Sequence, residues 1–264
     1  ITTRLRGLAY TELRVRAAAR DLHSGLFGGS ALNAANLLAR ILGELHDAQG
    51  RVAVPGFYDG AAEPSAAEKA SWAKLGFDEA AFLGGIGLSH PAGERDRSPL
   101  ERLWGRPTAD VNGLWGGYAG PGAKTVIPAE AGAKVSFRLV PGQDPEQVVA
   151  RFRRFVDAFL PPDARAEVVS LSTAPGIAIP ADSRFVHAAE AALRAEFGRP
   201  AVLIGSGGSI PVVESLRRLL GLDTLLMGFG LDDDQVHSPD EKFDLACFTC
   251  GTRAHARLLG QLAQ

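Results

Sequence analysis

Alternating apolar and polar residues define the first half of this chain. The run LAYTELRVRA, residues 8–17, alternates with a period of two, as expected for a strand with one buried face. Similar runs occur near residues 108–115 and 131–140, on either side of a Gly-rich turn, and a last one covers residues 166–172. The pattern therefore predicts four strands.

Helical spacing of apolar residues fills the intervals between these strands. It predicts one helix from Ser30 to His46, with Ser30 as the N-cap, and another that starts after the Pro141–Pro145 break. The order strand, helix, strand, strand, helix, strand is that of a ferredoxin-like α+β domain. We place this domain at residues 1–175 and treat residues 51–107, which are irregular, as an elaboration over it.

Residues 176–264 change to alternating strands and helices, which predicts an α/β unit with a mostly parallel sheet. Ser209 is expected to cap one of its helices, where free N–H groups can bind an anion. The expected elements, in order, are helix 182–197, strand 201–205, helix 210–220, strand 224–230 and helix 244–262.

Composition describes a globular chain without a charged binding surface. The 264 residues are 46% hydrophobic and carry a formal net charge of −2, with no basic run to bind nucleic acid and no apolar stretch that spans a membrane. We expect a cytoplasmic protein. Cys247 and Cys250 lie within a predicted helix and are interpreted as two core thiols. The chain starts at once with a strand and has no initial methionine, which is typical of the interior of a longer protein.

His237 is the first candidate for chemistry. It follows the apolar run MGFG and an acidic loop, and an imidazole placed there can ligate a metal or act as a base. A Ser-His-Asp hydrolase would use Ser206 or Ser209 with His237 and an aspartate from 232–234, but GSGGSIP does not match the G-x-S-x-G elbow. A non-catalytic binding or dimerisation module is a further alternative.

Two other residues have the chemistry of a binding site. His23 lies in a polar, Gly-rich turn that leads into the first predicted helix. Arg138 alternates with apolar neighbours in VSFRLV, and a guanidinium on a concave sheet face binds a carboxylate through two hydrogen bonds.

Several stretches together resemble one family. They are DLHSGLFGG, GPGAKTVIP, VSFRLVPGQDP, SGGSIPV, and MGFG followed by HSPDEKF, and they occur in family order from Arg6 to the C-terminus. The family is that of the co-catalytic zinc amidohydrolases, which includes carnosinase-type dipeptidases, glutamate carboxypeptidases, aminoacylases and acetylornithine deacetylase. The long 51–107 segment resembles the dipeptidase branch.

The resemblance implies metal-dependent hydrolysis of a peptide or N-acyl amino acid amide bond. Such enzymes hold two zinc ions, for which manganese or cobalt can substitute, in an α/β catalytic domain that is interrupted by a ferredoxin-like lid. The lid also forms the homodimer. By this resemblance, residues 1–175 are the lid and dimerisation domain, and residues 176–264 are the C-terminal half of the catalytic domain.

The family's functional residues map onto this chain by motif. His237 falls on a metal ligand. His23 falls on the lid histidine that polarises the scissile carbonyl in the partner subunit's site. Thr125, Arg138 and Ser209, with its neighbour Gly208, fall on substrate-binding positions, and Arg138 is the one that takes the carboxylate.

Two departures from the family limit the expected activity. The other metal ligands and the general base lie before the lid in the family, so we expect this chain alone to be inactive. In addition, Gly205 and Ser206 stand where dipeptidase relatives often have Arg-Glu, which leaves dipeptides and other N-acyl amino acids open as substrates.

Overall fold

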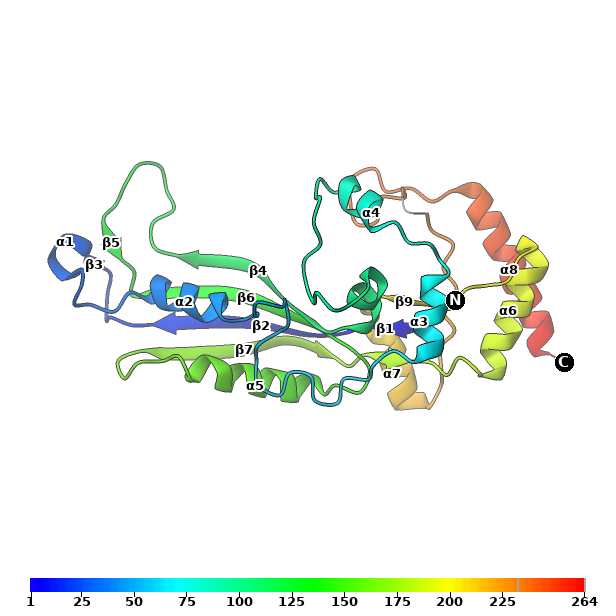
Figure 1. Cartoon of the computed structure of the whole chain (residues 1–264), viewed down its shortest axis with the longest axis horizontal. Helices are drawn as coiled ribbons and strands as arrows, with labels where there is room; N and C mark the ends of the chain where they lie inside the picture. Colours follow the sequence, from blue (N-terminus) through cyan, green and yellow to red (C-terminus); the bar gives the residue numbers. More distant parts are fainter. Residues whose placement is uncertain (232, 264) are drawn as a thin grey trace.

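The computed structural model describes residues 1–231 and 233–263. Its largest sheet has four strands in the order β4-β6-β2-β7, all antiparallel to their neighbours. The strands are β2 (Gly7–Arg16), β4 (Thr108–Gly116), β6 (Glu130–Leu139) and β7 (Arg165–Ala174). Figure 1 shows this sheet as the long half of the molecule, with the second unit at its other end.

Two helices complete the ferredoxin-like arrangement. Helix α2 (Ala34–Gly43) follows β2, and α5 (Pro145–Asp157) follows β6, so the chain order is that predicted from the sequence. Both helices pack on the sheet in one hydrophobic core, and the core includes the fully buried Leu13, Ile41, Phe137, Val149 and Phe152. The predicted fold class is therefore confirmed.

The start of the first helix differs from the sequence prediction. Helix α2 begins at Ala34, and its N-cap is Asn33, whose side-chain oxygen accepts hydrogen bonds from Ala35 N (2.9 Å) and Asn36 N (3.2 Å). Asn33 satisfies two of the free N–H groups of the first turn, so Ser30 is not the cap. The preceding residues instead form β3 (Leu22–His23) and the short helix α1 (Ser24–Phe27).

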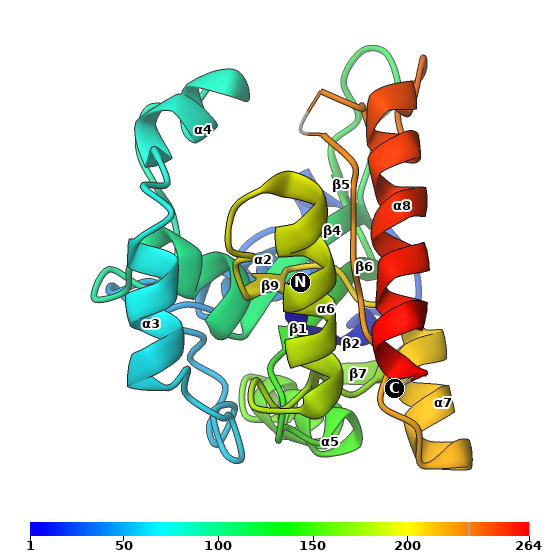
Figure 2. The ribbon, with the colours of Figure 1, turned by 90° about the vertical axis from the view of Figure 1, so that its right-hand side faces the viewer.

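The elaboration predicted at residues 51–107 is largely irregular and holds three short helices. These are α3 (Ala66–Ala73), α4 (Glu79–Gly85) and the π-helix η1 (Glu101–Gly105). In Figure 2, α3 and α4 lie on the opposite side of the molecule from α8. Within the segment, the Nε of buried Arg106 lies 2.6 Å from the Glu94 carboxylate. Arg106 also pairs with Glu63, and Glu94 with Arg97, so several ion pairs hold the segment together.

The second unit contains a small sheet in the order β8-β1-β9. Strand β1 (Thr2–Leu5) runs parallel to β9 (Ile204–Ser206) and antiparallel to β8 (Ile177–Ala178). The first residues of the chain thus pair with two distant strands, as in the pairs Arg4–Ala178 and Thr2–Ile204. Helices α6 (Arg184–Phe197) and α8 (Leu245–Leu262) lie side by side (Figure 2), and α7 (Pro211–Leu220) follows β9.

Four sequence predictions for this unit need correction. The strand predicted at 201–205 is instead the three residues of β9, and the stretch 224–230 contributes only an isolated bridge from Leu226 to Thr2. Helix α7 has Ile210 as its N-cap without a side-chain hydrogen bond, because the Ser209 hydroxyl is bonded elsewhere. Cys247 and Cys250 are free and half-buried, so they are not fully buried core thiols.

Within the residues described, every helix is too short or too polar to cross a membrane.

The Glu101 carboxylate allows the packing of the elaboration to be tested by measuring stability as a function of pH. Burial raises the pKa of Glu101, but the Lys69 ammonium (2.8 Å) and the Ser98 N–H and hydroxyl outweigh burial and lower the pKa from 4.5 to about 2. A carboxyl whose folded pKa is lowered stabilises the fold above its unfolded pKa, and this contribution is lost as pH falls.

We therefore expect Glu101→Gln to lower the melting temperature by a few degrees at pH 6 to 7. The gap to the wild type should shrink between about pH 4.5 and 2, as measured by thermal unfolding at each pH. Glu167→Gln, at an exposed position on β7, is the matched control and should show no such trend. A gap that stays constant with pH would contradict the assigned stabilisation.

Candidate functional site

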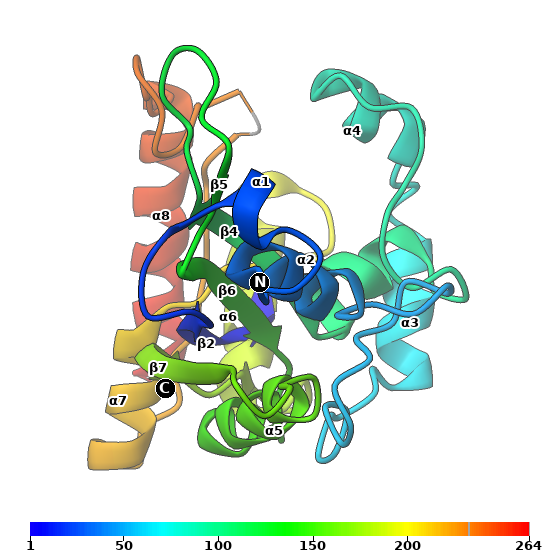
Figure 3. The ribbon, with the colours of Figure 1, turned by 90° about the vertical axis from the view of Figure 1, so that its left-hand side faces the viewer.

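The structure places His23 and Thr125 together at the far end of the large sheet. Strand β3 pairs with β5 (Val126–Ile127), which sets His23 opposite Val126, and Ser24 N donates to the Thr125 carbonyl at 3.0 Å. Both side chains are exposed. Figure 3 looks onto this end of the molecule, with α1 and the β4–β5 connection in front. We call this end the lid tip, residues 22–27 and 118–127.

The local hydrogen bonds of His23 fix its ring. Its Nδ1 accepts a hydrogen bond from Gly25 N at 3.0 Å, so Nδ1 carries no proton. In the neutral imidazole the proton is then on Nε2, which is the nitrogen left to act as a donor. A Cβ on Gly25 would lie 2.9 Å from the His23 ring, so glycine is needed there for this contact.

Arg138, Gly208 and Ser209 lie together at the opposite end of the sheet. Arg138 Nη1 donates to Ser209 Oγ at 3.1 Å, and Ser209 Oγ donates to the carbonyl of Arg6 at 2.7 Å. Gly208 N donates to Ser206 Oγ at 3.2 Å within the same turn. We call this place the hinge cluster, residues 6, 138 and 206–209, because it joins the large sheet to the second unit.

Arg6 connects the two sheets at this cluster, although no motif in the sequence marks it as a site residue. It is the single residue between β1 and β2. Its N–H donates to the Ser206 carbonyl and its Nε to the Gly207 carbonyl, both at 3.2 Å. Burial lowers the pKa of Arg6 to about 10, with a further lowering by the nearby Arg138 charge and an opposing effect of Asp110. At neutral pH the guanidinium stays charged.

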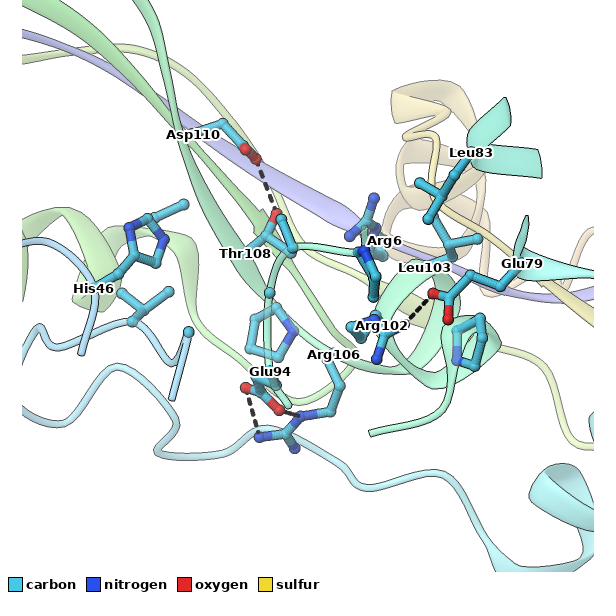
Figure 4. A pocket seen from close by; sticks show the side chains of 18 of the residues that line it. Arg6, His46, Glu79, Leu83, Glu94, Arg102, Leu103, Arg106, Thr108 and Asp110 are labelled. Carbon is cyan, nitrogen blue, oxygen red and sulfur yellow. Dashed lines mark hydrogen bonds and ion pairs between the residues drawn. The ribbon is translucent and has the colours of Figure 1, made fainter. Parts of the chain in front are cut away.

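A pocket of about 550 Å³ opens beside Arg6, between the elaboration and the large sheet. Figure 4 shows Arg6 between Thr108 and Leu103 on the pocket wall. Two other arginines of the wall have carboxylate partners: Arg102 pairs with Glu79, and Arg106 pairs with Glu94. The apolar part of the wall includes Phe77, Phe82, Leu83 and Leu103.

His237 lies apart from both groups, on an exposed loop with an unusual backbone. Among the described residues of this loop, three that are not glycine have positive φ, namely Gln235 (53°), His237 (63°) and Asp240 (62°). Such conformations are uncommon and cluster at functional sites. Asp234 closes the loop: its carboxylate accepts from Leu231 N (2.7 Å) and Lys242 Nζ (3.0 Å). These bonds lower the pKa of Asp234, first through Leu231 N and then through Lys242.

The described residues do not by themselves fit a metal ion. Catalytic zinc takes about three protein ligands. Residues 1–231 and 233–263 contain no group of three or more His, Cys, Asp or Glu side chains that could hold a metal. His237 has a ring exposed to solvent and can supply one ligand, so we derive no catalytic step through a metal from these residues.

The geometry also argues against a serine nucleophile. Ser209 Oγ is bonded to Arg6 and Arg138, and Ser206 Oγ accepts from Gly208 N. In the part of the chain that the structure describes, neither hydroxyl is bonded to a histidine, as a Ser-His pair requires. Asp232, the first of the aspartates considered as an orienting residue, lies outside the described residues.

The lid tip and the hinge cluster are separated by the length of strand β2. Arg138 pairs with Leu8 near one end of β2, and Glu130 pairs with Arg16 at the other end. Eight residues of extended chain span on the order of 25 Å, and the lid tip lies beyond Arg16. One subunit therefore cannot bring His23 onto Arg138 while this sheet is intact.

The chain is similar to known sequences along its whole length. A sequence model of the M20 family described as "Peptidase dimerisation domain" matches residues 3–164. The chain is 30% identical to the Cys-Gly metallodipeptidase DUG1 of Saccharomyces cerevisiae, over 98% of this chain and 54% of that protein. It is 29% identical to the human Beta-Ala-His dipeptidase, over 100% of this chain and 53% of that protein. The chain thus spans about half the length of these curated relatives.

Solved structures show the same fold. The di-peptidase Dug1p from Saccharomyces cerevisiae superposes with a TM-score of 0.83 at 28% identity, covering 98% of this chain and 55% of that one. The metallo-carboxypeptidase Sso-CP2 from Sulfolobus solfataricus gives 0.85 at 26% identity, covering 97% and 58%.

The Gly-rich stretch 205–208, which covers the end of β9 and the turn after it, yields a stability prediction. A Cβ on Gly205 would lie 2.5 Å from the Trp104 Cβ, whereas one on Gly208 would meet only Ser206 Oγ at 3.5 Å. We expect Gly205→Ala to lower the free energy of unfolding by roughly 1–3 kcal/mol through overpacking, and Gly208→Ala to change it by less than about 1 kcal/mol. Urea denaturation of both variants measures this. Equal effects would show that Trp104 does not pack on the turn as described.

Proposed function

The chain belongs to the M20 peptidase dimerisation-domain family, and from this premise we propose that the whole protein hydrolyses the amide bond of a peptide or an N-acyl amino acid with the help of a metal. In this proposal residues 1–175 are the lid and dimerisation domain, and residues 176–264 are the C-terminal part of the catalytic domain. The observation that carries the proposal is the separation of the lid tip from the hinge cluster along β2.

The hinge cluster is proposed to hold the substrate. Arg138 presents a guanidinium whose Nη1 is already oriented by Ser209, and a planar guanidinium binds a carboxylate through paired N–H donors. The Ser209 hydroxyl and the Gly208 backbone would contact the part of the substrate next to that carboxylate.

His23 is proposed to act on the scissile carbonyl. Because Nδ1 accepts from Gly25 N, Nε2–H is free to donate to an oxygen that gains negative charge in the transition state. Thr125 would assist from the adjacent strand, since its carbonyl already holds the His23 turn through Ser24 N.

The proposal requires two subunits. The lid tip lies on the order of 25 Å or more from the hinge cluster of its own chain, so a complete site needs the tip of a partner. A homodimer formed through the lid supplies it, because in a two-fold dimer each tip can serve the other subunit. The description of the matching family as a dimerisation domain supports this assembly.

Zinc is the proposed metal, with two ions in the complete enzyme and manganese or cobalt as substitutes. His237 would contribute one ligand, and the remaining ligands would come from parts of the whole protein outside these 264 residues. The names of the relatives, metallodipeptidase and metallo-carboxypeptidase, support a metal cofactor.

We propose a cytoplasmic location.

A non-catalytic dimerisation module is the second candidate. It is favoured by one observation, that the described residues hold no three-ligand metal group. The two candidates differ in whether the whole protein hydrolyses amide bonds, so activity measurements on the whole protein distinguish them.

The first experiment combines metal analysis with assembly. We expect active whole protein to contain zinc, manganese or cobalt and to lose activity with a chelator, and His237→Ala to reduce bound metal. The 264-residue chain alone should form a dimer by light scattering, without hydrolysing dipeptides or N-acyl amino acids. Active protein without any of these metals would disprove the metal-dependent mechanism, and a monomeric chain would disprove the lid dimer.

The second experiment tests catalysis across the dimer. His23→Ala should lower kcat by about 10²–10³ with little change in KM, because the lost hydrogen bond acts mainly on the transition state. Mixing His23→Ala and His237→Ala subunits should restore up to about a quarter of wild-type activity, since half of the dimers are mixed and each has one intact site.

A mixture of His23→Ala with His23→Gln is the control and should stay inactive. If the first mixture also stays inactive under conditions of subunit exchange, His23 does not act in the partner's site.

A further inference from the structure

The hinge cluster contains two arginines, and neither guanidinium forms an ion pair with a described carboxylate. Asp110, on the wall of the adjacent pocket, acts on the Arg6 charge without forming such a pair. Ser209 Oγ links them, as it accepts from Arg138 Nη1 and donates to the Arg6 carbonyl. The Arg138 charge acts on Arg6 strongly enough to lower its pKa. Within the described residues no carboxylate lies within 4 Å of either guanidinium, although other arginines of the same region have such partners.

Like charges in a partly buried place are unfavourable unless an anion joins them. Arg6 is held in this position by Gly207: its Nε bonds the Gly207 carbonyl, and its Nη2 lies 2.8 Å from where a Gly207 Cβ would be. The Arg6 guanidinium therefore lies fixed over a glycine. Its other N–H groups form no hydrogen bond with a described residue.

The pocket of about 550 Å³ indicates where the rest of a ligand would go. Arg6 lies on its wall, together with Thr108, which is the cross-strand neighbour of Arg138. The facing wall carries Phe77, Phe82 and Leu83 from the elaboration. An apolar side chain attached close to a carboxylate would bury its surface there while the carboxylate stays at the arginines.

We propose that Arg6 and Arg138 bind one carboxylate jointly and that the adjacent pocket takes the apolar side chain next to it. The inference rests on the proposed function in that Arg138 faces the substrate carboxylate. It makes Arg6 a second substrate-binding residue. It also defines the substrate class as peptides or N-acyl amino acids whose C-terminal residue is large and apolar.

The test is a binding measurement on the 264-residue chain, with three probes that separate the two features. N-acetyl-L-phenylalanine has both carboxylate and ring, N-acetyl-L-phenylalaninamide lacks the charge, and N-acetylglycine lacks the ring. By isothermal titration calorimetry, we expect the first to bind at least about tenfold more tightly than either of the others. Equal affinities for the acid and the amide would overturn the carboxylate site, and equal affinities for the acid and N-acetylglycine would overturn the pocket.

Substitutions then show which arginines bind the carboxylate. Arg6→Gln and Arg138→Gln should each weaken N-acetyl-L-phenylalanine binding roughly tenfold or more, because each removes a charge-assisted contact. Arg165→Gln, at an exposed position on β7 near the lid end of the sheet, is the matched control and should not change affinity. An Arg6→Gln variant that folds and binds like the wild type would show that Arg6 only holds the turn.

A measurement on the wild-type chain covers the case in which Arg6→Gln does not fold. The arginine Nε–H signals in ¹⁵N NMR spectra should shift for both Arg6 and Arg138 when N-acetyl-L-phenylalanine is added, and not when the amide is added. A shift of Arg138 alone, or of neither, would overturn the joint site. Amide-bond hydrolysis by the whole protein is independent of this result, so either proposal can fail while the other stands.

Discussion

The continuous pairing of β2 with β6 is the constraint on which the rest of the structure depends. Ten residue pairs, from Gly7–Leu139 to Arg16–Glu130, fix the length and the register of the large sheet. A slip by one residue would move every side chain of β2 to the opposite face and expose its buried set, which includes Ala9 and Leu13. The register therefore determines where Arg138 lies, and also how far it lies from the lid tip.

The hinge cluster shows how two sheets formed from distant sequence are joined with few contacts. Arg6 lies between the two sheets, and its main-chain N–H, its carbonyl and its side-chain Nε each form a hydrogen bond with the turn at 206–209. A substitution in that turn would thus act on both units. Close packing explains why glycines are needed in β9 and in the turn: Trp104 occupies the space that a Cβ at Gly205 would take, and the Arg6 guanidinium that of a Cβ at Gly207.

Sequence reasoning succeeded where the stabilising contacts are local and periodic. Strands β2, β4, β6 and β7 and helix α5 were predicted from alternation and from a Pro-initiated start, because a long element with one buried face repeats its pattern many times. The small sheet was predicted less well. Its strands have two to four residues, and β1 pairs with residues about 200 positions away, so no local pattern records the pairing. The N-cap at Asn33 was missed because Ser30 also has a side chain that favours caps, and the one at Ile210 because the Ser209 hydroxyl bonds Arg6 and Arg138 instead of the helix.

The fold class, the ferredoxin-like order of elements and the family resemblance follow from the sequence alone, since they depend on periodicity and on motifs along the chain. Which candidate residues lie together follows from the tertiary structure. Arg138 contacts Ser209, and Ser209 contacts Arg6. His23 lies beyond the far end of the ten-residue strand β2. The physical reason is that hydrogen bonds between sheets and turns join residues 71 to 203 positions apart, and the distance along the chain carries no information about such contacts. For His237, the sequence identified the imidazole, while the structure showed a loop of positive-φ residues closed by Asp234 and Lys242.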